Sequence, residues 1–165
     1  MDKNTHLIHR KGMDTRVPGY RMNDPNRRIR QVVEAYRSAI WEKNAEALID
    51  LYAADVRVFD LWGAWSYQGA EAWRKAIDQW FDSMGAERVR VTMEGVRINA
   101  ERPLGTVTAI VHYAGISAKG EELRAVLNRL SWVLKPDEGG WKIVHEHTSA
   151  PIGPHDGKVM LSPGK

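Results

Sequence analysis

The order of two hydrophobic patterns along the chain constrains the fold more than any other feature. Apolar residues recur at helical spacing only before residue 85, and after it the chain has strand patterns. The strand segments near residues 87–99, 104–117, 122–135 and 140–149 are rich in Val, Ile and Thr and are separated by turn signals. Helices followed by a meander of strands predict an α+β domain with a mainly antiparallel sheet.

Three helices are predicted before this meander. The first begins at Asp24-Pro25, because Asp caps helices and Pro fits their first position. A shorter helix follows Asn44, and a third follows Gly69. Short strands are expected from Val56 to Asp60 and from Trp65 to Gln68. The three helical faces comprise Ile29, Val32, Val33, Tyr36, Ile40 and Trp41; Ala47, Leu48, Leu51 and Tyr52; and Ala72, Trp73, Ala76, Ile77, Trp80 and Phe81.

Composition narrows the class of protein. A chain of 165 residues suits one domain with a substantial core. No apolar run approaches the roughly 20 residues of a spanning helix, and the first 20 residues lack a signal-peptide pattern. The chain has no cysteine, which excludes disulfides and Cys-based zinc sites and favours a cytoplasmic location. It contains no phosphate loop or dinucleotide fingerprint, so we expect no cofactor.

Positive charge is concentrated at the start of the chain. Residues 1–30 hold eight basic and three acidic side chains, or +5, which leaves −2 for the remainder of the net +3. We therefore divide the chain into an extended arm (residues 1–23), a domain (24–150) and a tail (151–165). Because the domain itself is not basic, we expect neither nucleic acid nor a membrane as a partner.

Three stretches carry a resemblance to a known family. They are Ala53-Ala54-Asp55-Val56 through Asp60, Tyr67-Gln68-Gly69, and Trp141 to Pro151 preceded by Arg129-Leu130-Ser131. Together with the element order they resemble the SnoaL-like branch of the nuclear-transport-factor-like superfamily. The last stretch is also similar to the association domain of calcium/calmodulin-dependent kinase. The resemblance implies a cone-shaped α+β barrel, with three helices packed on a strongly curved sheet around a pocket for a small molecule.

The resemblance also implies which residues face that pocket. On the last strand, alternation groups Val144, Glu146 and Thr148 on one side and Ile143, His145 and His147 on the other. By resemblance, the side with Glu146 faces the cavity. A buried carboxylate needs a partner, and Arg129 on the neighbouring strand is the expected one.

Asn128 and Arg129 are consecutive, so a regular strand cannot turn both inward. The family pattern favours Arg129 and Ser131 inside. The Arg129–Glu146 pair would then either contact a ligand or only fix the register of the sheet.

Asp60 and Tyr36 are the expected catalytic residues. Asp60 ends a strand beside two tryptophans, and apolar surroundings raise a carboxyl pKa toward a range useful for proton transfer. In ketosteroid isomerase, which has this fold, an Asp at the matching strand end moves the proton. Tyr36 falls where that enzyme's tyrosine stabilises the oxyanion, and Asn128 falls near its second donor. Alternatively, Asp60 binds backbone N–H groups and Tyr36 belongs to the core.

The remaining expected ligand-binding residues are Trp62 and Trp65 at the pocket mouth, and Val111 and Tyr113 on a central strand. Aromatic side chains at a mouth suit a flat apolar ligand, although they could equally form a packed lid. His145 and His147 point the same way on a strand, but a third metal ligand is not evident beyond His112, so we expect no metal site.

Two functions are consistent with these residues. One is a cofactor-independent isomerase, cyclase or dehydratase that acts on a small hydrophobic carbonyl compound. The other is a non-catalytic module that holds a small acid through Arg129. For either function we expect a homodimer or larger homo-oligomer built through the convex face of the sheet.

Overall fold

The computed structural model describes residues 25–101 and 103–162. The helices are α1 (Pro25–Trp41), α2 (Ala45–Ile49) and α3 (Ala70–Ser83). The strands are β1 (Tyr52–Phe59), β2 (Tyr67–Gln68), β3 (Arg88–Glu101), β4 (Leu104–Ile116), β5 (Glu122–Asp137) and β6 (Gly140–Ser149). The predicted cap Asp24 and the arm of residues 1–23 lie outside the described residues.

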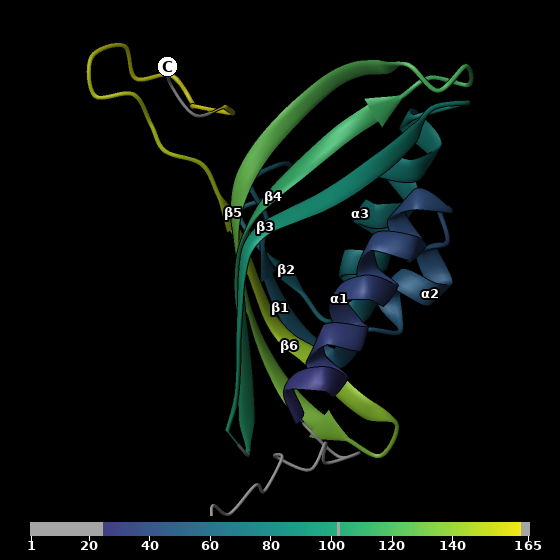
Figure 1. Ribbon diagram of the computed structural model, residues 1–165, viewed down its shortest axis with the longest axis vertical. Coiled ribbons are helices and arrows are strands. Elements are labelled where there is room, and N and C mark those ends of the chain that lie inside the picture. The colour runs from purple at the N-terminus through teal and green to yellow at the C-terminus, as the bar shows by residue number, and fades with distance from the viewer. Residues whose placement is uncertain (1–24, 102, 163–165) are drawn as a thin grey trace, which may run out of the picture.

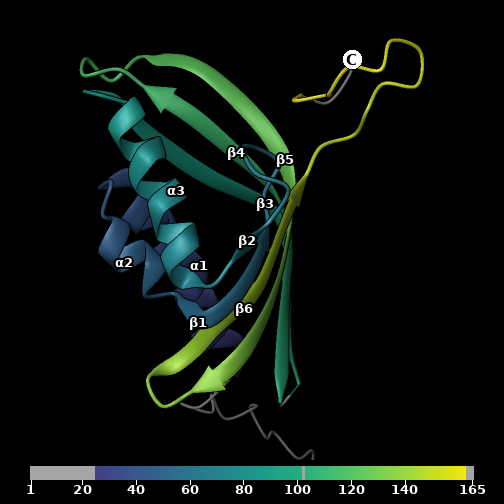
Figure 2. The same ribbon diagram turned by 180° about the vertical axis from the view of Figure 1, so that it is seen from behind.

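All six strands form one curved, open sheet in the order β2-β1-β6-β5-β4-β3. Neighbouring strands are antiparallel except β1 and β6, which run parallel. Figures 1 and 2 show the three helices on the concave side of this sheet, and none of the described helices lies on its convex side. The predicted α+β cone with a mainly antiparallel sheet is therefore confirmed.

The apolar stripe of α1 packs against the sheet. Ile29, Val32, Val33, Tyr36 and Ile40 are all buried.

Trp41, predicted in the same stripe, is instead 38% exposed, and the guanidinium carbon of Arg88 lies 5.3 Å from its ring centroid. It is the last residue of α1, where the helix leaves the core, so a cation–aromatic contact replaces burial.

Asn44 caps α2 as predicted, because its side-chain oxygen accepts a hydrogen bond from the backbone N–H of Ala47 at 2.9 Å. The helix is shorter than its apolar pattern suggested and ends at Ile49. Leu51 and Tyr52 were predicted on its face, yet Tyr52 begins β1 and is buried from there. A periodicity of four residues does not distinguish one helical turn from the start of a strand.

The pairing of β4 with β5 decides which side chains enter the cone. Val111 pairs with Asn128, and Val107 pairs with Trp132; all four are buried on the concave face. The intervening pair, Ile110 with Arg129, is exposed on the convex face.

A β-bulge in β6 changes the alternation that the sequence predicts. Val133 pairs with His145 whereas Leu134 pairs with Ile143, so Val144 is an extra residue. The prediction that Ile143 lies on the side of His145 and His147 is therefore wrong. Ile143 is fully buried on the same side as Glu146 and Thr148.

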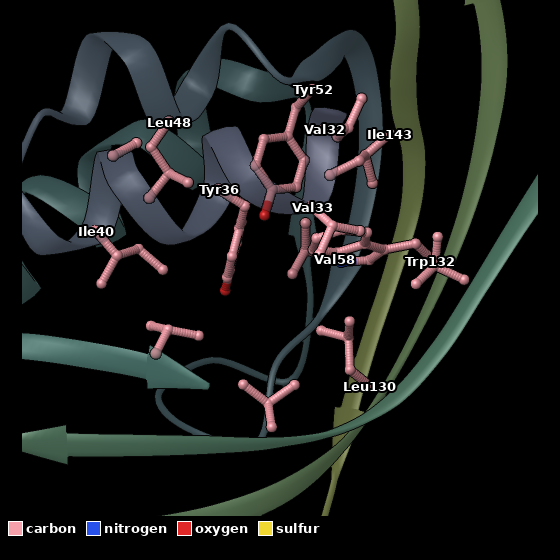
Figure 3. Close-up of a cluster of buried hydrophobic side chains, with 14 of the residues drawn as sticks. Val32, Val33, Tyr36, Ile40, Leu48, Tyr52, Val58, Leu130, Trp132 and Ile143 are labelled. Atoms are coloured by element: carbon pink, nitrogen blue, oxygen red, sulfur yellow. The ribbon is translucent and has the colours of Figure 1, made fainter. Parts of the chain in front are cut away.

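The core lies between the three helices and the concave face of the sheet. Figure 3 shows Val33, Leu48, Val58 and Ile143 packed around the ring of Trp132 and two tyrosines. Among the described residues, no helix is long and apolar enough to span a membrane.

Candidate functional site

A cavity of about 540 Å³ lies between α3 and the concave face of the sheet. Its volume is within the ~300–1,000 Å³ typical of small-molecule sites. Its polar wall residues come from α1, the end of β1, β2, α3, β4, β5 and β6, and its apolar wall combines tryptophans with aliphatic side chains. The aromatic, charged and amide side chains in the wall include Tyr36, Asp60, Trp62, Tyr67, Trp73, Trp80, Tyr113, Arg124, Asn128 and Glu146.

Glu146 lies in the cavity wall at the centre of β6 and is only 1% exposed. Its Oε2 accepts hydrogen bonds from the Tyr52 hydroxyl at 2.6 Å and from the Trp132 indole N–H at 2.8 Å. Burial raises the pKa of Glu146 to about 7; the Tyr52 hydrogen bond lowers it, and the charge of Asp60 raises it further. A carboxyl group of this kind can hold or release a proton near neutral pH.

Asp60 follows β1 and faces the same cavity. Its Oδ1 accepts a hydrogen bond from the Thr148 hydroxyl at 2.7 Å, and its Oδ2 accepts one from the Trp62 backbone N–H at 3.2 Å. Thr148 in turn accepts from the Leu61 backbone N–H at 2.7 Å. Burial raises the pKa of Asp60, and the hydrogen bonds from Thr148 and Trp62 oppose that rise. Asp60 thus binds a backbone N–H group, as the second interpretation expected, and it also faces the cavity. Its catalytic role stays a prediction.

Two tyrosine hydroxyls meet in the wall opposite α3. The hydroxyl oxygens of Tyr36 on α1 and Tyr113 on β4 lie 2.9 Å apart. Burial raises the pKa of both phenols, so both stay protonated at neutral pH. Because one hydroxyl donates to the other, a second O–H remains available for an oxygen atom in the cavity.

Asn128 is 6% exposed and contributes to the same wall. Its Oδ1 is buried without a hydrogen-bond partner in the part of the chain that the structure describes. A buried amide oxygen without a donor costs free energy, so this atom is an acceptor that a bound molecule can satisfy.

Comparison with known families agrees with this architecture. Residues 29–153 match the SnoaL-like domain family. The chain belongs to the SnoaL-like family. No curated protein matches the chain at a significant level.

Solved structures similar to this SnoaL-like chain share its fold. A nuclear transport factor 2-like protein of unknown function from Pseudomonas putida has a TM-score of 0.75 at 20% identity, covering 85% of this chain and 96% of its own. A nuclear transport factor 2-like protein with a cystatin-like fold from Novosphingobium aromaticivorans has a TM-score of 0.65 at 19% identity. The match covers 79% of this chain and 84% of that protein. A nuclear transport factor 2-like superfamily protein from Salmonella enterica has a TM-score of 0.65 at 17% identity. The match covers 81% of this chain and 97% of that protein.

The predicted Arg129–Glu146 pair is wrong. Arg129 and Ser131 are exposed on the convex face, where Arg129 pairs across strands with Ile110 and Ser131 with Thr108. Asn128 takes the inward position that the sequence analysis gave to Arg129. The reason is that the pairing of β5 with β4 places Asn128 inside, and the β6 bulge places Glu146 beside Trp132.

The other predicted residues separate into two groups. Tyr36, Asp60, Trp62, Tyr113 and Glu146 all line the cavity.

By contrast, Val111 is fully buried in the core, and Thr148 supports Asp60 by its hydrogen bond. Trp65 is 98% exposed and lies outside the cavity wall, because the loop turns outward between Trp62 and Tyr67.

His145 and His147 lie on the convex side, and their rings make edge contacts with Phe59 at 5.1 and 5.9 Å. The Nδ1 atom of His145 donates to the backbone carbonyl of Arg57 at 2.8 Å. Within residues 25–101 and 103–162, no three His, Asp or Glu side chains gather as a metal site.

Sequence reasoning missed the residues that hold Glu146. Tyr52 was assigned to a helix face, and Trp132 was not considered as a donor. The residue types themselves were an indication, because tyrosine and tryptophan can each donate a hydrogen bond from a largely apolar side chain inside a core. Finding them required the bulge in β6 and the start of β1, which no periodicity reveals.

Proposed function

We propose that this SnoaL-like protein binds a small, mainly apolar carbonyl compound in the cavity and moves a proton on it without a cofactor. The observation that carries the proposal is the convergence of Asp60, Glu146 and the Tyr36–Tyr113 hydroxyl pair on one cavity. Isomerisation, cyclisation and dehydration all need such a set, because each removes a proton beside a carbonyl group and returns a proton elsewhere.

Each group has a role in this proposal. Asp60 removes the proton, because it faces the cavity while hydrogen bonds from Thr148 and Trp62 fix its orientation. The free O–H of the tyrosine pair donates to the carbonyl oxygen as negative charge develops on it. Glu146 exchanges a proton near neutral pH and can return it to the product.

Deuterium exchange tests proton removal without knowledge of the natural substrate. A cyclic ketone is incubated with the protein in D₂O, and incorporation at the carbon beside the carbonyl is followed by NMR. We expect Asp60→Asn to slow exchange by about 10²–10⁴-fold. Asp55→Asn is the matched control, since Asp55 lies exposed on the same strand.

Equal exchange by Asp60→Asn and the unchanged protein, with intact fold and ketone binding, would remove Asp60 from the mechanism. Absence of ketone binding to the unchanged protein would reject the pocket as a site for this class of molecule.

A second candidate function is a binding and assembly module. It is favoured by the convex sheet face, which none of the helices within residues 25–101 and 103–162 covers and on which Ile110 is 41% exposed. Two copies could bury this face against each other, as the resemblance implies. Light scattering tests this: Ile110→Asp should halve the mass of a dimer, and an unchanged mass would place the interface elsewhere.

The chain's location is part of the same proposal. We propose that it acts in the cytoplasm, because its sequence contains no cysteine and thus gives no sign of adaptation to an oxidising compartment.

A further inference from the structure

The charged side chains of the cavity wall differ in position: the acidic ones lie inside and the basic one lies at the rim. Among the described residues that line it, the carboxyl groups belong to Asp60 and Glu146, and the one cationic side chain is Arg124. Arg124 is at the rim, with 63% of its side chain exposed, and its guanidinium lies 2.6 Å from the carboxylate of Glu87. The positive charge is therefore already balanced outside, whereas the two carboxyl groups are inside.

Hydrogen-bond acceptors are available in the same wall. Asn128 presents a buried Oδ1 that has no donor within the described residues. Both described hydrogen bonds to Glu146 end on Oε2, and the residue belongs to the cavity wall. Asp60 adds a third acceptor. The wall also holds donors, among them the Trp73 indole N–H, which is buried without a partner within the described residues. Its charge is therefore what separates ligands: two carboxyl groups lie inside, and the one cation among the described lining residues lies at the rim.

The apolar part of the wall favours the same chemistry. Trp62, Trp73 and Trp80 line the cavity together with Tyr67. Aromatic faces carry partial negative charge and attract cations. An anion placed among them would lose its hydration and would meet two carboxyl groups in return, which is strongly unfavourable in a desolvated site.

We propose that the ligand of this cavity is an apolar molecule bearing an amino or hydroxyl group, and that carboxylates and phosphates are rejected. The inference rests on the proposed function and narrows its substrate to an amino- or hydroxy-substituted carbonyl compound without an acid group. The donor group faces Asn128 and Glu146, while the carbonyl oxygen meets the tyrosine pair. This reverses the expectation of a small acid held by Arg129, since that cation lies on the convex face.

Three probes with one ring system test the charge preference. They are 2-naphthylmethylamine, 2-naphthalenemethanol and 2-naphthoate, titrated by calorimetry at about pH 8, where the amine is a cation and the acid an anion. Shifts of the Trp73 and Trp80 indole N–H signals in NMR spectra locate the bound probe in the cavity. We expect the amine to bind at least about tenfold more tightly than naphthoate, with the alcohol between them.

Variants connect this preference to the carboxyl groups. Glu146→Gln should reduce the amine-to-naphthoate affinity ratio by about tenfold. Asp60→Asn should also reduce the amine-to-naphthoate affinity ratio, and this variant provides the test if Glu146→Gln does not fold. Glu94→Gln, on the exposed side of β3, is the matched control and should leave the ratio unchanged.

The outcomes separate this inference from the proposed function. Tight naphthoate binding that is lost in Arg124→Gln would make the rim cation an anion anchor and overturn the inference, while the pocket itself would stand. An unchanged affinity ratio in both carboxyl variants would also overturn it. Failure of all three probes to bind would reject the pocket and the inference together.

Discussion

The hydroxyl group of Thr148 on β6 lies 2.7 Å from Oδ1 of Asp60 at the end of β1, and it also accepts the backbone N–H of Leu61. This single side chain joins two parallel strands to the first turn of the loop at the cavity mouth. Since the Thr148 hydrogen bond favours the ionised form of Asp60, its removal should raise the pKa of Asp60 further.

Thr148→Val tests this relationship, because valine keeps the shape and lacks the hydroxyl. We expect the acidic limb of the pH profile for ketone exchange to move to higher pH, and a carbon NMR titration of the Asp60 carboxyl to move with it. Thr148→Ser keeps the hydroxyl and should behave like the unchanged protein. A titration curve that does not move in the valine variant would show that the hydrogen bond has no influence on Asp60.

Glu146 should make the stability of the protein depend on pH. Its pKa in the folded state, about 7, is above the ~4.3 of an unfolded glutamate. The unfolded chain therefore releases its proton first as pH rises. The contribution to stability is fully present below about pH 4 and is lost as pH rises through about 7. Asp60, whose pKa is also raised, acts in the same direction.

Glu146→Gln should flatten this dependence. Urea unfolding at about pH 5 and pH 8 should show a smaller loss of stability in the variant, by on the order of 2–3 kcal/mol. Glu94→Gln is the control, as an exposed glutamate on β3. Parallel pH profiles for the unchanged protein and Glu146→Gln would mean that Glu146 is ionised in the folded state throughout.

The hydrogen bond from Tyr52 to Glu146 is expected to matter more when Glu146 is charged. Tyr52→Phe removes the 2.6 Å donor and should cost about 1–3 kcal/mol of unfolding free energy. The cost should be larger at about pH 8 than at pH 5, because a donor stabilises the carboxylate more than the acid. Tyr67→Phe, at the cavity mouth, is the control, and an equal cost at both pH values would contradict the prediction.

Tyr36 and Tyr113 are expected to be energetically coupled through their hydroxyls. Each single Phe variant should cost about 1 kcal/mol, and the double variant should cost less than the sum, because the one hydrogen bond is lost only once. Thermal unfolding of the four proteins gives the coupling energy. Additive costs would mean that the two hydroxyls do not bond in solution.

Gly105 on β4 permits close packing at the narrow end of the cone. A Cβ atom there would overlap the side-chain end of Ile29 and would lie 3.0 Å from the Trp141 ring. Gly105→Ala should therefore destabilise the protein by about 1–3 kcal/mol in urea unfolding. Gly139→Ala is the control, since nothing lies within 4 Å of its added Cβ. Equal stability of the two variants would show that Ile29 and Trp141 can move aside.

The sequence determined the fold class and part of the site. Helical spacing in residues 25–41 and 70–83 and period-2 alternation beyond residue 87 are local properties, because each needs only neighbouring residues to be read. The resemblance to the SnoaL-like branch, applied to these elements, implied that Asp60, Trp62, Tyr36 and Glu146 belong to the pocket, and all four line the cavity.

Only the tertiary structure decided how these residues are paired. The pairing of β5 with β4 places Asn128 inside and Arg129 on the convex face, and one extra residue at Val144 reverses the alternation of β6, so that Glu146 lies beside Trp132. Glu146 then depends on Tyr52 and Trp132, which are 94 and 14 residues away in the chain. A strand's side chains alternate strictly, so a single bulge exchanges inside for outside, and its position depends on contacts between strands that no single strand contains.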